Sequence, residues 1–335
     1  MVWLGSILSR VDRFLVTILL TVGFAAVLPA RGETAVASGW LTDSAIALLF
    51  FMHGARLSPE AAFQGARQWQ LHTVVFLSTF ALFPLLAVTA HRLAPGFLPA
   101  PLWAGVILLA ALPSTVQASI AFTSVARGNV AAALCSASAS SLLGIFLTPL
   151  IAGFLLTSHG AEISARSVLT IVVQLLLPFM AGQLSRPWLG ALVARNPRAL
   201  KCVDYGSIVL IVYTAFSHGV ADGIWHQVDA IDLVKVALVD VALLAAVMTI
   251  LTFGSRRLGF VRADEITIVF CGSKKSLASG LPIATVLFAG HVGLIIIPVM
   301  VFHQVQLMVC ASLARHYAAR RDRTERLAAV AATTA

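Results

Sequence analysis

The fold of this chain depends on one polar stretch, which reads Phe270-Cys271-Gly272-Ser273-Lys274-Lys275-Ser276-Leu277-Ala278-Ser279-Gly280-Leu281-Pro282. Strongly apolar runs, 266–270 and 283–288, flank it on both sides. Charges near the middle of a membrane are costly, and Gly and Pro weaken helices there. The stretch therefore predicts a broken membrane helix whose polar residues form a site. The alternative is an external loop with solvated lysines, but the flanks leave too few residues for two complete spans around such a loop.

Composition assigns the chain to the helical membrane proteins. Of its 335 residues, 59% are hydrophobic and only 11% are charged, whereas soluble domains carry roughly 25% charged residues. The apolar segments are mostly longer than barrel strands and do not alternate. The net charge of +9 comes from arginines between the segments, with no basic run interleaved with aromatic residues. We therefore expect no nucleic-acid partner.

Ten apolar segments can be drawn along the chain, joined by short connections, and they predict a single transmembrane domain. They are 14–29, 40–54, 71–92, 102–126, 130–157, 167–184, 203–219, 233–254, 266–289 and 292–314. The polar and basic tail, 315–335, is expected to be cytoplasmic and disordered beyond its first turns.

Most of the 23 lysines and arginines lie on one side of this ten-span arrangement. That side holds the N-terminus, the tail and the connections after segments two, four, six and eight. The opposite side holds only Arg31, Arg92, Arg166 and Lys235. Because positive residues favour the cytoplasmic side, both termini are expected in the cytoplasm, in a multi-pass protein of the cell (inner) membrane.

The two halves of the chain echo each other. Segment two ends with Phe51-Met52-His53-Gly54, and segment seven ends with Phe216-Ser217-His218-Gly219. Segment four is interrupted at Pro113, as segment nine is at Gly272–Pro282. Repeats over about 14–157 and 167–314 contain five spans each, so the second repeat must enter the membrane upside down. Inverted repeats with matched interrupted helices predict a secondary transporter whose site lies near the midplane.

The candidate site combines polar residues of the two breaks with those of neighbouring segments. It comprises Lys275, Lys274, Ser273, Ser276, Ser114, Thr115, Gln117, Ser119, Ser136, Ser140, His303 and Gln304. Ser136, Ser140 and Gly144 also fit a groove of small residues for helix packing. Asp240 is the only acidic residue well inside an apolar run, so it is a candidate charge partner for Lys274 or Lys275. His53 and His218 are either pH-sensitive groups or caps at the membrane interface.

Three further motifs carry a resemblance to a known family. They are the turn Ala126-Arg127-Gly128-Asn129-Val130, the serine-rich fifth segment ending in Leu147-Thr148-Pro149, and the string Cys271…Lys275-Ser276-Leu277…Gly280-Leu281-Pro282. From about Phe14 to Ala314 the chain resembles the bile acid:sodium symporter superfamily, in its divergent SBF-like branch. The resemblance implies an all-α fold of ten helices in two inverted repeats. It also implies panel helices 1, 2, 6 and 7, and core helices 3, 4, 5, 8, 9 and 10, with broken helices four and nine crossing near the midplane.

The family's sodium ligands are largely replaced in this chain. On the alignment that the resemblance implies, the glutamate of helix nine falls on Val269, and the glutamine and asparagine that follow it fall on Ser273 and Lys274. The remaining positions are Ile120 in helix four, Ala133 and Ala137 in helix five, and Thr79 in helix three. Because sodium prefers several oxygens, at least one of them usually anionic, no metal site of the usual kind is expected.

This exchange suggests that an ammonium group, that of Lys275 first, occupies the crossing where sodium would sit. Adjacent residues of a helix point about 100° apart, so one lysine is expected to face the cavity and the other a half-helix end. The alternative is a Lys274 side chain that extends to one membrane surface. A lysine buried at the crossing could exchange its proton, which makes proton coupling chemically possible.

The function expected from the sequence is secondary transport of a small organic anion by alternating access. Na⁺ or H⁺ is the possible coupling ion, no other cofactor is expected, and the other partner is membrane lipid. One alternative is a membrane regulator of cation handling that does not itself transport. Another is an intramembrane hydrolase, for which Ser273 and Lys274 offer only a weak dyad.

Overall fold

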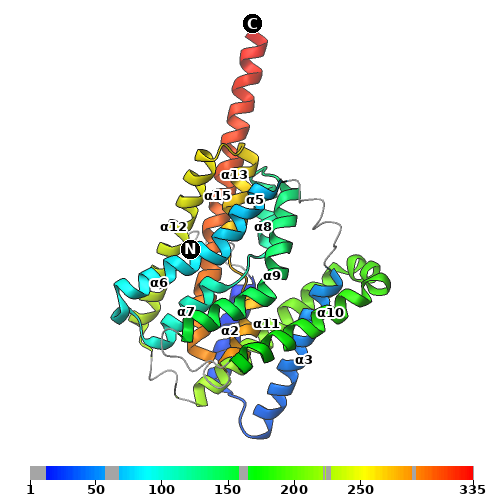
Figure 1. Ribbon diagram of the computed structural model, residues 1–335, viewed down its shortest axis with the longest axis vertical. Coiled ribbons are helices and arrows are strands. Elements are labelled where there is room, and N and C mark those ends of the chain that lie inside the picture. Colours follow the sequence, from blue (N-terminus) through cyan, green and yellow to red (C-terminus); the bar gives the residue numbers. More distant parts are fainter. Residues whose placement is uncertain are drawn as a thin grey trace, which may run out of the picture.

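The computed structural model describes residues 13–56, 68–157, 165–221, 223, 228–288 and 292–334, and every regular element in these ranges is helical. Each of the ten apolar segments corresponds in sequence to one helix or to two successive helices, which Figure 1 shows in their spatial arrangement. The elements are α2 (Arg13–Val27), α3 (Glu33–Arg56), α5 (Trp69–Leu77), η2 (Ser78–Leu82), α6 (Phe83–Leu93), η3 (Pro95–Phe97), α7 (Ala100–Ala111), α8 (Val116–Val125), α9 (Val130–Thr157), α10 (Ala165–Arg195), α11 (Pro197–Ala221), α12 (Ala230–Arg257), α13 (Arg262–Gly272), α14 (Leu277–Leu287) and α15 (Val292–Thr334).

Six helices in the described ranges are long and apolar enough to cross a membrane. They are Glu33–Arg56, Trp69–Leu93, Val130–Leu156, Arg198–Ala221, Ala230–Arg257 and Val292–Ala319. The pair α7 and α8 adds a seventh if it is one span, bent by 64° at its break. The chain is therefore an all-helical, multi-pass membrane protein with a broken helix, as predicted, while the count of ten spans in two inverted repeats stays a prediction.

Both breaks have local causes in the sequence. At the first, Pro113 forces the preceding residue out of the helical region, and Leu112 is extended with ψ 151°. At the second, α13 ends at Gly272, and α14 restarts after the extended residue Ser276, whose Oγ accepts a hydrogen bond from the N–H of Ser279. The breaks contact each other, because the N–H of Ser276 donates to the carbonyl of Pro113 over 2.9 Å. Two helices that are interrupted separately thus meet at their interruptions.

The helix formed by α5, η2 and α6 contains one π-helical turn, Ser78–Leu82, with a clear cause. Pro84 has no N–H, and the N–H of Phe83 donates to the carbonyl of Ser78, five residues back. The α-helical partner of the Thr79 carbonyl is therefore engaged elsewhere, and its π-helical partner is a proline. The carbonyl of Thr79 is free for another donor. Such π-turns are frequent at functional sites.

Helices α3 and α10 approach each other at their backbones. A Cβ atom on Gly54 would lie 2.0 Å from the carbonyl oxygen of Phe179, and one on Gly182 would lie 1.9 Å from that of Phe51. Helix α11 packs against both α2 and α3, and the hydroxyls of Thr42 and Thr214 lie 2.9 Å apart between α3 and α11. These contacts join the four helices into one packed group, and its members α3 and α10 lie side by side at the lower right of Figure 1.

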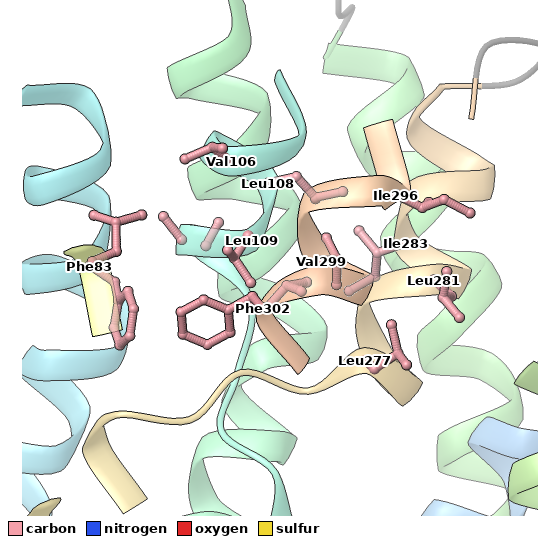
Figure 2. Packing of buried hydrophobic residues seen from close by; sticks show 14 of the residues in the cluster. Phe83, Val106, Leu108, Leu109, Leu277, Leu281, Ile283, Ile296, Val299 and Phe302 are labelled. Atoms are coloured by element: carbon pink, nitrogen blue, oxygen red, sulfur yellow. The ribbon is translucent and has the colours of Figure 1, made fainter. Parts of the chain in front are cut away.

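The hydrophobic core encloses the two breaks. Figure 2 shows side chains of α6, α7, α14 and α15 packed around the extended chain between the half-helices. The rings of Phe83 and Phe302 meet edge to face with centroids 5.9 Å apart, and both residues are fully buried. A core of this kind excludes water from the polar groups at the breaks.

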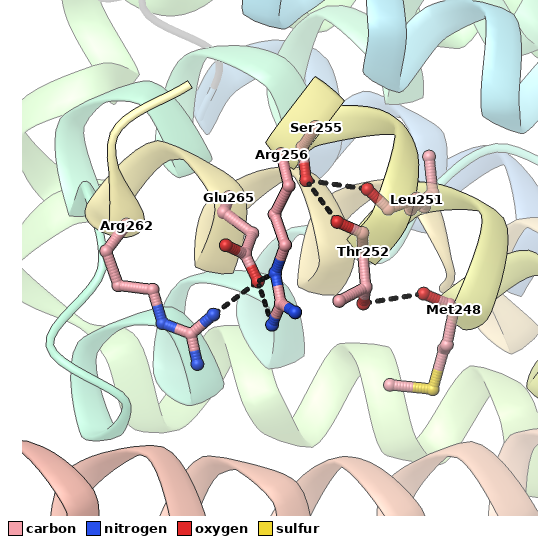
Figure 3. Close-up of polar contacts among 7 residues, drawn as sticks. All are labelled: Met248, Leu251, Thr252, Ser255, Arg256, Arg262 and Glu265. Atoms are coloured by element: carbon pink, nitrogen blue, oxygen red, sulfur yellow. Dashed lines mark hydrogen bonds and ion pairs between the residues drawn. The ribbon is translucent and has the colours of Figure 1, made fainter. Parts of the chain in front are cut away.

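One end of the molecule is fixed by a buried carboxylate. Figure 3 shows Glu265, at the start of α13, between Arg256 of α12 and Arg262. The Oε1 atom of Glu265 lies 3.1 Å from Nη2 of Arg256. In the α8–α9 turn beside it, Asn129 donates to Asp264 over 2.8 Å. These contacts tie the end of α8 to the start of α13, so Asp264 and Glu265 have structural roles.

The C-terminal segment differs from expectation. We predicted a tail disordered after its first turns, but α15 continues as one helix to Thr334 and projects beyond the other helices (Figure 1). The segment is rich in Ala and Arg, which are strong helix formers. Helical propensity, rather than low complexity, therefore determines its backbone.

Candidate functional site

Lys275 lies at the crossing of the two breaks, with its side chain fully buried. Its ammonium nitrogen, Nζ, donates to the carbonyls of Thr79 (2.7 Å), Ala110 (2.7 Å) and Leu112 (2.8 Å). The ring of Phe83 lies below it, with its centroid 4.3 Å from Nζ. Three donors thus meet three acceptors and an aromatic face.

The carbonyls at the end of α7 need such a donor because the helix stops there. The last carbonyls of a helix have no partner within it. Here Lys275 serves Ala110 and Leu112, the hydroxyl of Thr148 donates to Ala111 over 2.9 Å, and Ser276 N–H serves Pro113. The carbonyls of residues 110–113 are therefore all hydrogen-bonded inside the core.

Hydroxyl groups perform the same task at the end of α13. The carbonyl of Gly272 accepts from Ser78 Oγ (2.8 Å) and that of Cys271 from Ser114 Oγ (2.6 Å). Ser119 Oγ lies 3.4 Å from the carbonyl of Phe270. Most partners of each half-helix end thus come from the other break or from the π-turn, and Thr148 of α9 adds one. The two ends differ in charge, since an ammonium meets α7 and hydroxyls meet α13.

Lys274 has a separate environment. Its Nζ donates to the carbonyl of Ala118 over 3.0 Å and lies 3.8 Å and 5.3 Å from the ring centroids of Phe122 and Phe270. Its side chain is fully buried, so it does not extend to a membrane surface. The two lysines diverge as expected, with Lys275 at a half-helix end, but Lys274 lies among aromatic rings rather than facing the cavity.

Gln306 of α15 holds the backbone of the second break. The N–H of Lys275 donates to its Oε1, and its Nε2 donates to the carbonyl of Lys275, both over 2.9 Å. The same Nε2 lies 3.1 Å from Nδ1 of His303. Gln304, which we placed in the candidate site, is half-buried and takes no part in these bonds. The signal that identifies Gln306 is its spacing of one helical turn from His303.

A cavity of about 510 Å³ lies beside the crossing. The N-terminal ends of α8 and α14 line one wall with Ser114, Thr115, Gln117 and Ser276, and His303 lies nearby. The opposite wall is formed by α3 and α11 with His53, Arg56, Lys201 and Asp204.

Three charged residues of this cavity were not among those predicted. Asp204 Oδ2 lies 3.5 Å from both Nη1 of Arg56 and Nε2 of Gln117, and Lys201 is the third. From the sequence, Arg56 and Lys201 were interpreted only as charges that set the orientation in the membrane, and Asp204 was not singled out.

Other predicted residues lie apart from the cavity. Ser136 Oγ is 2.6 Å from Nδ1 of His72, between α5 and α9, whereas Ser140 Oγ accepts from the N–H of Ser114 at the first break. Ser273 is buried at the second break. His218 is exposed, unlike its counterpart His53.

Asp240 does not pair with either lysine. It is fully buried on α12, and within the described part of the chain neither carboxylate oxygen has a hydrogen-bond partner. Both ammonium groups bond instead to backbone carbonyls, which lie closer to the breaks.

The positions aligned with family sodium ligands carry few side-chain oxygens here. Val269, Ala133 and Ala137 are buried apolar residues, and Ile120 is half-buried. The hydroxyl of Thr79 donates to Val75, so Thr79 reaches Lys275 through its carbonyl. Among the described residues, no group of three or more His, Cys, Asp or Glu side chains could hold a metal ion.

Comparison with known proteins extends over almost the whole chain. The model of the SBF-like CPA transporter family matches residues 12–319. The Escherichia coli protein named "Putative symporter YfeH" is 52% identical over 319 residues, 95% of each chain. Uncharacterized protein PA2026 of Pseudomonas aeruginosa is 51% identical over 313 residues, 93% of this chain and 94% of its own. Sodium/bile acid cotransporter 7 of Xenopus tropicalis is 27% identical over 313 residues, 90% of both. The resemblance seen in the sequence is confirmed, and the chain belongs to the SBF-like CPA transporter family.

Proposed function

We propose that this protein is a secondary active transporter that carries a small organic anion by alternating access. The observation that carries the proposal is the cavity of about 510 Å³ beside the crossing. Two half-helix N-termini open into it from one side, and Arg56 and Lys201 lie on the other. An anion in this cavity would meet positive charge on both walls.

The N-terminus of α8 is especially suited to an anion. Its N-cap residue, Thr115, makes no side-chain capping bond, and the Thr115 Oγ1 atom is buried without a hydrogen-bond partner among the described residues. A helix N-terminus carries about half a positive elementary charge and free N–H donors. An anionic oxygen would satisfy donors that the protein itself leaves unsatisfied.

The arrangement of the helices is compatible with alternating access. We assign α2, α3, α10 and α11 to a panel and the remaining spans to a core, as two inverted repeats of five spans. The cavity is lined from both groups, so rocking of one group against the other would open it to either side. The arginine distribution supports a cytoplasmic location for both termini in the inner membrane.

The names of the relatives support transport. One is called a symporter and another a sodium/bile acid cotransporter. Membership of a transporter family decides against the hydrolase, and Lys274 Nζ donates to a backbone carbonyl, that of Ala118.

The experiment introduces a carboxylate where the anion should bind. Purified Gln117→Glu protein places a negative charge in the first turn of α8, which stabilises the helix but occupies the anion site. Because the new carboxylate also lies beside that of Asp204, whose Oδ2 is 3.5 Å from the Gln117 side chain, the two effects on stability oppose each other. We expect a folded protein with at least a tenfold loss of binding and vesicle uptake of probe anions. The probes are taurocholate, octanoate and succinate.

The matched control is Ser124→Glu, which adds the same charge to the exposed far end of α8. It should leave binding unchanged. If wild-type vesicles take up no probe above protein-free vesicles, and no probe stabilises the protein, the result favours a regulator of cation handling over a transporter of these anions.

A further inference from the structure

We propose that the carbonyl cage around Lys275 is a cation site that the chain fills with its own side chain. The ammonium group would be a tethered substitute for a free coupling cation, so that the resting protein needs no bound sodium. The consequence for coupling rests on the proposed transport function, whereas the site itself does not.

The number of donors indicates the charged form of Lys275. An ammonium has three N–H donors and no acceptor, and three carbonyl oxygens surround Nζ at 2.7–2.8 Å. A neutral amine has only two donors, and its lone pair would face a carbonyl oxygen at hydrogen-bond distance. The ring of Phe83 adds a further favourable contact for a cation, 4.3 Å away.

The cage has the composition of a site for a hard monovalent cation. All three ligands are backbone oxygens, two from the end of a half-helix and one from the π-turn at Thr79. Carbonyl oxygens suit hard cations, and the unwound carbonyls of broken helices coordinate coupling ions in transporters. A sodium ion and an ammonium in this small space would repel each other, so the two should exclude one another.

The position of the ammonium is fixed from both directions. Gln306 bonds to both the N–H and the carbonyl of Lys275, which holds the base of the side chain. At the other end, the Thr79 carbonyl is available because Pro84 provides no helical N–H. The cage is thus preorganised, and the three carbonyls of Thr79, Ala110 and Leu112 are the hydrogen-bond partners of Nζ among the described residues.

Lys274 provides a matched control within the same stretch. It is equally buried, but its Nζ meets only one carbonyl together with the rings of Phe122 and Phe270. Truncating it should leave an aromatic hollow rather than an oxygen cage. The two lysine variants therefore remove the same charged group and the same aliphatic chain, but from different surroundings.

The experiment measures thermal unfolding of the purified full-length chain in sodium, potassium, choline or n-propylammonium chloride, each at about 150 mM. For wild type, the midpoint of thermal unfolding should be the same in all four salts. For Lys274→Ala it should likewise not depend on the salt. Lys275→Ala should have a lower midpoint than wild type in choline, and sodium or n-propylammonium should partly restore it. The n-propylammonium ion replaces the deleted carbon atoms and charge of the lysine side chain. With a dissociation constant of about 5 mM, the recovery would be a roughly 30-fold shift toward the folded state, or about 3 °C.

Two outcomes would overturn the proposal. One is a sodium-specific rise in the midpoint of the wild type, which would place a sodium site beside the lysine. The other is a Lys275→Ala protein that no cation restabilises, which would make Lys275 a structural cross-link only. If folded Lys275→Ala protein cannot be purified in choline chloride, it is purified in n-propylammonium chloride. If no folded protein is obtained in that salt either, the result counts as the second outcome. Lys275→Met, which fills the space without charge, should respond to no salt. No arm requires a transported substrate, so a failure here is distinct from a failure of the proposed transport function.

Discussion

At the scale of single residues, the breaks are held by side chains that replace missing backbone partners. Gln306 does this most completely, since its amide bonds to both backbone groups of Lys275. A side-chain amide offers a donor and an acceptor close together in one plane, as a backbone peptide group requires. The position of Lys275, and therefore of its ammonium, depends on this pair of bonds.

We expect Gln306→Leu to destabilise the protein. Two buried backbone groups would lose their partners, at about 1–3 kcal/mol each. Thermal unfolding in one detergent should show a clear decrease of the midpoint. Gln304→Leu, two residues away and half-buried, should change stability by no more than about 0.5 kcal/mol. Equal effects of both substitutions would contradict the role assigned to Gln306.

At the scale of elements, two features oppose the usual preferences of helices. The π-turn Ser78–Leu82 persists because Pro84 cannot close the α-helical ladder. Helices α3 and α10 approach so closely that only glycine fits at Gly54 and Gly182. Proline and glycine would weaken an isolated helix. Here Pro84 leaves a carbonyl for Lys275, and the glycines allow α3 and α10 to pack closely.

Pro84→Ala should lower stability, against the usual trend. Replacing Pro by Ala within a helix ordinarily stabilises it, by up to about 3 kcal/mol. Here a restored ladder would engage the Thr79 carbonyl that Lys275 uses. Pro187→Ala, at an exposed position inside α10, is the control and should stabilise. A more stable Pro84→Ala protein would show that the π-turn does not serve Lys275.

Gly182→Ala should separate α3 from α10. Its Cβ would lie 1.9 Å from the backbone oxygen of Phe51, and overpacking of this kind costs about 1–3 kcal/mol. Gly206→Ala in α11 meets no atom within 4 Å and should be neutral or slightly stabilising. Midpoints of thermal unfolding for the two variants, measured side by side, check the prediction.

At the scale of the whole molecule, the cavity lies between two groups of helices that Asp204 connects. Its carboxylate lies 3.5 Å from Arg56 on α3 and 3.5 Å from Gln117 on α8. It therefore places a negative charge where an anion would enter and occupies one arginine of the cavity. An incoming anion must compete with this residue for the same positive groups.

Asp204→Asn should therefore bind probe anions more tightly, by about three- to tenfold. The measurement is the concentration of anion that gives half of the maximal thermal shift. Asp43→Asn, on an exposed face of α3, removes the same charge elsewhere and should leave this concentration unchanged. Weaker binding by Asp204→Asn would mean that the carboxylate positions Arg56 rather than competing with the anion.

The helices and both breaks could be predicted from the sequence because their causes are local: apolar runs, Pro113, and the polar stretch at Gly272–Ser276. The contacts of the breaks could not, since the carbonyl of Thr79 and the amide of Gln306 are far from Lys275 in sequence. Gln304 and Gln306 differ by two residues, or about 200° around a helix, and only packing shows which one faces the break. Arg56 and Lys201 were interpreted only as charges that set the membrane orientation, and nothing in the local sequence distinguishes Asp204.

Helix α15 links the interior of the protein to its surroundings. It runs without interruption from Val292 to Thr334, so the segment that grips Lys275 through Gln306 continues into the part that projects outside (Figure 1). At 1.5 Å per residue, its 43 residues span about 65 Å. The part beyond Gln306 is about 42 Å long at 1.5 Å per residue, so a small rotation of the helix at the crossing produces a larger displacement at its tip. The fluorescence of a fluorophore fused to that tip would therefore report conformational changes at the centre of the protein.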